Sequence, residues 1–164
     1  MAITMSNAKA NVKTFFYKLY IRETGTAMAA ADYDTLAHWN TFLALFTHAG
    51  QCENQNVKLD HEKSGEITVD LGKKRFTTYD GKFEAKYVQG AVADLTAIRA
   101  DLVGGDVDIL LVDTQNAKAI YIHNVELFVD MHESSGDIFN ALFSAEQIIP
   151  IDQKLDTTVV IPAA

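Results

Sequence analysis

The chain has 164 residues and a formal net charge of −8, with 48% hydrophobic and 22% charged residues. This size and composition are typical of one globular domain with a sizeable core, and no stretch approaches the roughly 18 continuous apolar residues of a membrane span. The polar first 13 residues lack the apolar core of a signal peptide, so export by that route is not expected, and a single cysteine, Cys52, excludes an internal disulfide and a cysteine-based metal site.

The charge is distributed unevenly along the sequence. Residues 90–164 contain three basic residues against twelve acids, whereas residues 1–50 have an excess of one positive charge and residues 51–89 are balanced. An acidic half with so few basic residues argues against binding of a phosphate backbone. It is typical of a surface that keeps a protein dispersed, and it also suits a surface that nucleic acid passes without binding.

The first 50 residues predict a strand followed by a helix. Residues 1–11 are expected to form a flexible N-terminus, and the aromatic-rich segment Phe15–Glu23 predicts a strand. A second, helix-like segment covers about 34–49, with Asp34 or Thr35 as its N-cap and Gly50 as its end. Its apolar residues recur at helical spacing and predict a buried stripe of Leu36, Trp39, Phe42, Leu43 and Phe46.

Residues 57–89 alternate apolar and polar side chains, which is typical of strands with one packed face and one exposed face. Ser64-Gly65 is a turn signal, and the basic stretch Gly72–Arg75 reads as a second turn. Asp80-Gly81 is a hairpin signal, because both positions tolerate a positive φ angle. The pattern therefore predicts an antiparallel meander of short strands.

The next segments predict a helix packed on that sheet and then a buried strand. A helix is expected over about 91–103, ended by Gly104-Gly105. Its shared face consists of Val92, Leu95, Ile98 and Leu102. The continuously apolar run Val107–Val112 predicts a central strand.

A long strand is predicted to follow, with alternate residues on one face: Tyr121, His123, Val125, Leu127, Val129 and Met131. Ser134–Asp137 reads as a turn, and residues 138–143 form either a short strand or a turn of helix. The tail, residues 151–164, is expected to be an extended C-terminal arm. Its strand-forming part can pair with its own sheet or with the edge of a neighbouring subunit.

The predicted fold class is α+β, mainly β, in a single domain covering residues 1–164. It is an antiparallel β-sandwich or barrel with one packed helix over about 91–103, a helix-like segment over about 34–49 and extended termini.

Residue types that bind metals occur in three places without a suitable pattern. Asp60-His61-Glu62 and His132-Glu133 lie on predicted strands, where adjacent side chains point to opposite faces. A third group, Asp106, Asp108 and Asp113, does not have the spacing of an EF-hand loop. We therefore expect no metal site, and these residues are interpreted as polar strand ends.

No catalytic motif is present either. His123 lies on an otherwise apolar strand face and is expected to be a hydrogen-bonded, partly buried histidine rather than a catalytic base. Cys52 follows a predicted helix end, where nothing lowers its pKa. Trp39 and its stripe are interpreted as core rather than as a ligand pocket. Gly104-Gly105 follows a helix and so has the wrong polarity for phosphate binding. No catalytic, cofactor-binding or metal-binding residue is assigned, and the protein is not expected to be an enzyme.

The basic turn Lys73-Lys74-Arg75 has two interpretations. It is either a solvated hairpin tip or a contact with the acidic half of a neighbouring subunit.

Four stretches follow one another in a recognisable order. They are GQCENQNVKLDHEKSGEITVDLGKKRFTTYDGKFEAKYVQ, the helix AVADLTAIRADL, the strand VDILLVD, and KAIYIHNVELFVDMHESSGD. This succession, over roughly residues 50–143, resembles the tail tube proteins of long-tailed phages, which share a fold with the inner-tube proteins of contractile injection systems. The helix-like segment at 34–49 departs from that pattern and would be an insertion or an interface element.

The resemblance implies a virion structural protein that is assembled in the host cytoplasm. Six copies would form a ring, and rings would stack into a tube with an acidic lumen through which DNA passes as repelled cargo. The implied partners are further copies of the chain and other tail proteins, with no membrane and no cofactor. Phe15–Glu23 and Ile151–Ile161 are expected to supply contacts between subunits.

Other functions are compatible with the same residues. One is a non-viral, β-rich binding or adaptor module, or another virion or injection-system component. Another is a small enzyme whose site would be assembled from the separated residues His123, Asp130 and His132.

Overall fold

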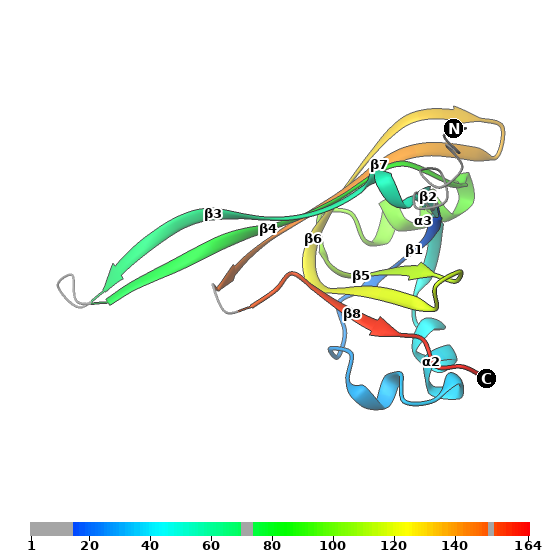
Figure 1. Ribbon diagram of the computed structural model, residues 1–164. Helices are drawn as coiled ribbons and strands as arrows, with labels where there is room; N and C mark the ends of the chain where they lie inside the picture. The colour runs from blue at the N-terminus through cyan, green and yellow to red at the C-terminus, as the bar shows by residue number, and fades with distance from the viewer. Residues whose placement is uncertain (1–14, 70–73, 151–152) are drawn as a thin grey trace, which may run out of the picture.

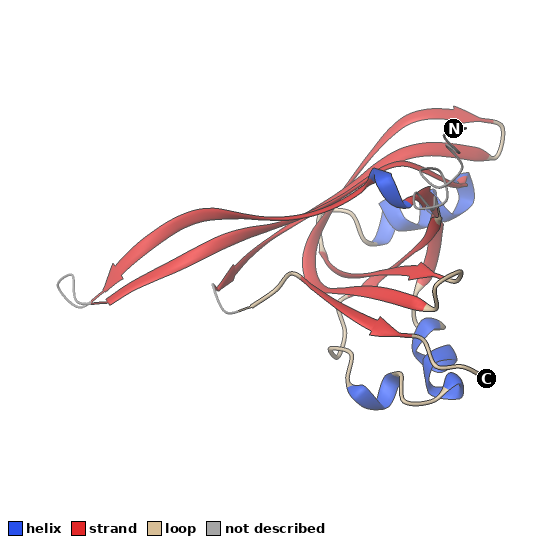
Figure 2. Ribbon diagram, viewed as in Figure 1, coloured by secondary structure: helices blue, strands red, loops and turns tan. Residues whose placement is uncertain are grey.

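The structure is a computed structural model that describes residues 15–69, 74–150 and 153–164. In chain order, the elements are β1 (Phe16–Glu23), η1 (Ala30–Asp32), α2 (Leu36–Leu43), β2 (Thr47–Glu53), η2 (Asn54–Asn56), β3 (Val57–Val69), β4 (Lys74–Ala91), α3 (Val92–Asp101), β5 (Asp106–Asp113), β6 (Lys118–Ser135), β7 (Ile138–Pro150) and β8 (Asp156–Val160). Strands dominate the molecule, as Figure 2 shows, so the predicted mainly β fold is confirmed. None of the helices in these residues has the length and apolar character needed to cross a membrane.

Six of the strands close into an antiparallel barrel in the order β2–β1–β5–β6–β7–β4. The closing contact joins β2 to β4 through the pair Gln51–Gln89. Two strands lie outside this ring, because β8 adds to β6 and β3 adds to β4. Because the ring closes, the longer open sheet edges among the described residues belong to strands that lie outside it or extend past it.

The long hairpin of β3 and β4 extends well away from the barrel (Figure 1). We call the part of this hairpin beyond the Leu59–Phe83 pair, residues 60–82, the arm. The end of β7 runs along its base, pairing from Glu146 to Pro150 with β4. The arm is therefore a three-stranded ribbon near the barrel and a two-stranded ribbon farther out.

The protein has two hydrophobic clusters that share β5. Alternate β5 residues, Val107, Ile109 and Leu111, point into the main cluster inside the barrel. Leu110 and Val112 point the other way, into a second cluster beneath α2. The continuously apolar sequence of β5 follows from burial on both faces, and the predicted central strand is confirmed.

The packed helix was correctly predicted from its apolar spacing. Helix α3 spans Val92–Asp101, and its residues Leu95 and Ile98 are buried in the main cluster. Val92 and Leu102 pack against the same cluster at the edges of this face. Gly104 ends the segment with a φ of 79°, a left-handed conformation that glycine adopts without strain.

The helix expected over 34–49 is only half correct. Thr35 is its N-cap, accepting a hydrogen bond from the His38 backbone N–H, but helix α2 ends at Leu43. From Thr47 the chain forms β2, which pairs with β1 and closes the barrel. Tertiary pairing therefore overrides the helical stripe, although Trp39, Phe42 and Phe46 are buried together as expected.

The short-strand meander predicted over 57–89 is wrong. The region is one long hairpin, and Ser64-Gly65 lies at a register shift within the pair β3–β4 instead of at a turn. Asp80-Gly81 lies within β4, paired with β3 on one side and with β7 on the other. Leu155 packs against Gly81, where a Cβ would lie 3.0 Å from its side chain. This glycine allows close packing rather than a turn.

The single apolar face predicted for residues 121–131 is divided by a bulge. The β5–β6 register shifts between Val107 and Ile109, and Asn124 on β6 has a φ of 54°. Before the bulge, Tyr121 points into the second cluster; after it, Val125 and Leu127 point into the barrel. One extra residue thus exchanges the faces of the strand.

The remaining alternatives are decided by strand pairing. Residues 138–143 begin the 13-residue strand β7, and residues 156–160 pair with β6 of the same chain. Leu155 and Val159 of this tail are buried, so its described part belongs to the domain core. Strand β1 pairs with β2 on one edge and β5 on the other. Any contact that Phe15–Glu23 makes with a neighbouring subunit would therefore use side chains rather than a free strand edge.

Gly90 sits where β4 approaches β2 most closely. A Cβ at Gly90 would lie 2.1 Å from the Ala49 carbonyl oxygen, which is backbone and cannot rotate away. We expect Gly90→Ala to lower the free energy of unfolding by about 1–3 kcal/mol, as overpacking does. At Gly105 the nearest atom to a Cβ is 3.5 Å away, so Gly105→Ala is the matched control. Urea denaturation of both variants tests this, and equal losses would contradict it.

Candidate functional site

The four long strands form a sheet in the order β3–β4–β7–β6, and its two faces differ sharply. One face is turned towards the interior of the barrel and continues along the underside of the arm. Its buried side chains include Phe83, Ala145 and Leu127. The opposite face carries seven carboxylates and three lysines: Lys58, Asp60 and Glu62 on β3; Asp80, Lys82, Glu84 and Lys86 on β4; Glu146 on β7; Glu126 and Asp130 on β6. We call this the acidic face.

Strand register places charges of the acidic face in rows. One row crosses all four strands through Asp60, Lys82, Glu146 and Glu126. Glu126 lies directly opposite Glu146, an arrangement that repels and is unfavourable in a sheet without a compensating role.

Two of the three lysines of this face are paired with carboxylates. Lys82 Nζ lies 3.2 Å from Glu62 Oε2, and Lys86 Nζ lies 3.1 Å from Glu84 Oε1. The hydrogen bond to Glu62, with the charge of that carboxylate, raises the pKa of Lys82 above its usual value. With seven carboxylates against three lysines the face has a formal charge of −4 (3 − 7), so its field is negative.

The same sheet has an open edge on each side within the described residues. Strand β3 pairs with β4 alone. Strand β6 pairs with β5 as far as Glu126, and from Phe128 to Ser135 it pairs with β7 alone. Unpaired strand edges of this length are ready templates for pairing with another chain.

A buried network of charged and hydrogen-bonded side chains is centred on Asp108 of β5. Asp108 of β5 is fully buried, and its Oδ2 lies 2.8 Å from Arg22 Nη2. The Tyr121 hydroxyl donates to the same carboxylate, and the Asn124 backbone N–H donates to Oδ1 at 2.9 Å. Imidazole Nδ1 of His123 lies 2.8 Å from Oδ1. Asp108 thus ties β1 and the β6 bulge to β5.

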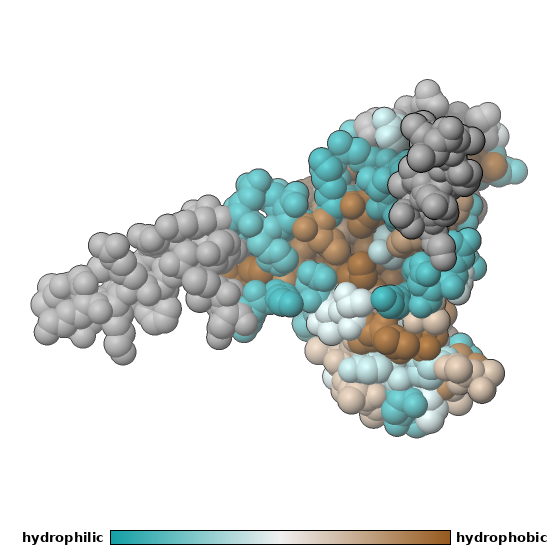
Figure 3. Space-filling view, in the orientation of Figure 1, coloured by the Kyte–Doolittle hydropathy of each residue, from teal (hydrophilic) through white to brown (hydrophobic). Residues whose placement is uncertain are grey.

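Arg22 extends the network towards residues 24–46, which we call the helical lobe. Its guanidinium lies 5.2 Å from the Phe42 ring centroid and 4.8 Å from that of Phe46, which are cation–π contacts. Figure 3 shows hydrophobic surface gathered between the base of the arm and this lobe.

The network shifts two pKa values. Burial alone would raise the pKa of Asp108, but the hydrogen bonds from Asn124, Arg22 and Tyr121 outweigh it, so the pKa is lowered and the carboxylate is ionised. Burial, together with the charge of Asp108, raises the pKa of Tyr121 to about 12.

The residues with metal-binding side chains are not assembled into a site. His61 Nε2 accepts a hydrogen bond from the Leu155 backbone N–H, while its neighbour Glu62 pairs with Lys82 on the other face. Asp113 accepts three hydrogen bonds within its own turn and lies far from the Asp108 network along β5. The described residues contain no group of three potential ligands. The side chains of His132 and Glu133 lie outside those that the structure describes. Of the basic stretch, Lys73 lies outside the described residues, whereas Lys74 and Arg75 begin β4 instead of a turn, with side chains that are not described.

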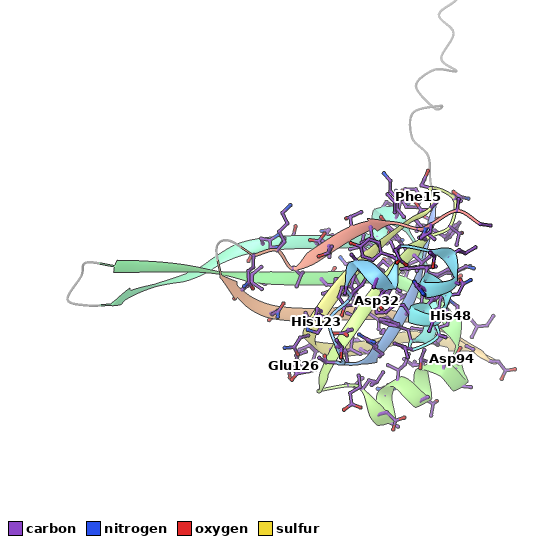
Figure 4. The ribbon with its side chains drawn as sticks, turned by 90° about the horizontal axis from the view of Figure 1, so that it is seen from below. Phe15, Asp32, His48, Asp94, His123 and Glu126 are labelled. Carbon is purple, nitrogen blue, oxygen red and sulfur yellow. The ribbon has the colours of Figure 1, made fainter. Side chains whose placement is uncertain are left out.

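His123 is hydrogen-bonded and partly buried as predicted, with 39% of its side chain exposed. It does not meet Asp130, which lies beyond the bulge on the acidic face. Viewed from below, His123 and Glu126 lie on the side from which the arm extends, and Phe15, His48 and Asp94 lie on the far side (Figure 4).

Cys52 is buried, and burial raises the pKa of its thiol to about 11, so it is protonated at neutral pH.

Comparisons with known proteins place no relative beside this chain. No protein-family model, no curated protein and no solved structure matches it.

Proposed function

We propose that this chain is a self-assembling structural subunit, and specifically a tail tube protein of a phage virion whose stacked rings surround an acidic lumen. The observation that carries the proposal is the sheet β3–β4–β7–β6, which has an open edge on each side and one strongly acidic face.

The two open edges suit one another. All three strand pairs in this sheet are antiparallel, so β3 and β6 run in opposite directions. If β6 of one copy lies beside β3 of the next, the antiparallel alternation continues across the joint. Such a contact joins different surfaces of two identical subunits, and repeating it with a fixed rotation closes a ring.

The acidic face provides a reason for the ring. Closing the sheet would place its seven carboxylates on one surface of a continuous barrel, and the apolar face is already occupied by the core. A lumen lined this way repels DNA phosphates and lets the genome slide without binding. The like-charge pair Glu126–Glu146 then has a functional justification.

A non-viral binding or adaptor module is the alternative, and the complete core of the barrel favours it. A closed barrel with two buried clusters is stable without a partner. Assembly state separates the two proposals.

The test is sedimentation velocity over a 1,000-fold concentration series (about the range over which weak self-association becomes visible), with negative-stain electron microscopy of each fraction. Rings or tubes of constant diameter are expected. A monomer at every concentration would overturn the tube proposal and leave the binding module.

A further inference from the structure

A cavity of about 250 Å³ opens beside the buried charge network, in a place that the assembly proposal does not use. Its walls come from β6, β7, the helical lobe and the approach to β8. Its base includes the buried side chains of Ile149 and Leu155. An apolar base with a few converging polar groups is the usual composition of a small-molecule site.

Among the described residues that line the cavity, Lys154 provides a positive charge. Lys154 and His123 border the cavity, together with the polar residues Gln147 and Thr157. Among the described residues that line it there is no aspartate or glutamate. This contrasts with the rest of a chain whose net charge is −8. The nearest buried carboxylate, Asp108, forms an ion pair with Arg22 at 2.8 Å. The positive charge of Arg22 therefore offsets the repulsion between Asp108 and an anion in the cavity.

His123 is oriented for this role by its hydrogen bonds. Nδ1 faces both Asp108 Oδ1 at 2.8 Å and the Tyr121 hydroxyl at 3.0 Å. Because Asp108 is ionised, Nδ1 carries a hydrogen, and Nε2 is the ring nitrogen that remains for the cavity. Nε2 is therefore free to form a hydrogen bond with a ligand in the cavity.

The volume limits the ligand to a small one. Sites for drug-sized molecules usually measure about 300–1,000 Å³, so this cavity is below that range. We propose that it binds one small oxyanion, a phosphate or a carboxylate, held by Lys154 and His123 with hydrogen bonds from Gln147 and Thr157. Bound there, the anion would hold the start of β8 to β6 and β7.

The test is isothermal titration calorimetry of the full chain at pH 6, with inorganic phosphate in one arm and acetate in the other. Chloride at matched ionic strength is the blank in both arms. We expect one site per chain. Saturation with phosphate alone assigns a phosphate site, and saturation with acetate assigns a carboxylate site. Absence of saturable binding of either anion would overturn the proposal.

Variants localise the binding. Lys154→Ala changes an exposed side chain, so the fold is expected to survive, and it should weaken binding by about tenfold or more because one charged hydrogen bond is lost. His123→Gln should also weaken binding, because the hydrogen bond between Nε2 and the ligand is lost. Lys118→Ala, an exposed lysine of β6 outside the cavity, is the matched control. Equal affinities in all three variants would show nonspecific attraction and refute the site.

Discussion

Replacing Asp108 with alanine is expected to lower the free energy of unfolding by about 3–5 kcal/mol, because removing one partner of a buried ion pair leaves the other charge uncompensated. Arg22, whose side chain is only 10% exposed, would lose its 2.8 Å partner. The Asn124 N–H and the Tyr121 hydroxyl would lose their acceptor at the same time. Guanidinium denaturation monitored by circular dichroism measures the loss.

The matched control for Asp108 lies two residues earlier on the same strand. Asp106 is exposed, and Asp106→Ala should change stability by no more than about 0.5 kcal/mol. If Asp108→Ala costs less than about 1 kcal/mol, Arg22 must reach solvent or another partner, and the network would not be the link between β1, β5 and β6.

The same residue gives the wild-type protein a defined acid sensitivity. The pKa of Asp108 is lowered in the folded state from its usual 3.8, so its stabilising contribution is complete above that value. The contribution is lost as the pH falls through the lower, folded-state pKa. Between pH 5 and pH 2 the wild type should therefore lose more stability than Asp108→Ala does.

Those parts of the fold that depend on local pattern were predictable. The continuously apolar β5 and the spaced apolar residues of α3 each specify their element without help from the rest of the chain. The errors occur where a segment that is distant in the sequence determines the local structure. Thr47–Glu53 forms a strand through its pairing with β1, and Gly81 lies within β4, where the lack of a side chain leaves room for Leu155.

The bulge in β6 shows why face assignments fail. Simple alternation places Tyr121 and Val125 on the same side, yet one inserted residue at the left-handed Asn124 separates them. Asparagine tolerates that conformation better than most residues, which is the only local signal for the bulge.

The candidate sites were harder to predict from the sequence than the fold was. Arg22 and Asp108 are 86 residues apart, and no spacing rule connects them. The acidic C-terminal half was evident, but the acidic face also recruits Asp60, Glu62, Asp80 and Glu84 from a region whose charges balance. Charge segregated along the sequence is therefore not the same as charge segregated on the surface, because strand register sorts side chains by face.

Shortening the arm is expected to abolish assembly while leaving the barrel intact. In this variant, residues 64–78 are replaced by Asn-Gly, a two-residue hairpin turn that joins Lys63 to its cross-strand partner Tyr79. Among the hairpin residues whose side chains the structure describes, Phe83 is the buried core residue nearest the deletion, so the free energy of unfolding should change little. The open edge of β3, however, falls from 13 residues to seven.

The expected effect on association is large. Losing about six residues of edge pairing, each with a net hydrogen-bond contribution of about 0.5–1.5 kcal/mol, removes at least about 3 kcal/mol per joint. That corresponds to at least roughly 100-fold in the association constant for each contact. Every joint of a closed ring is weakened, so rings and tubes should disappear from the concentration series.

Leu45→Ser separates edge pairing from general hydrophobic association. Leu45 is 60% exposed in the helical lobe, outside both open edges, so its replacement should leave tubes unchanged. If the shortened arm still gives normal tubes, the β3 edge is not the joint and another surface must drive the assembly. If Leu45→Ser also dissolves them, association is driven by exposed apolar surface, and the continuous barrel of alternating strands is refuted.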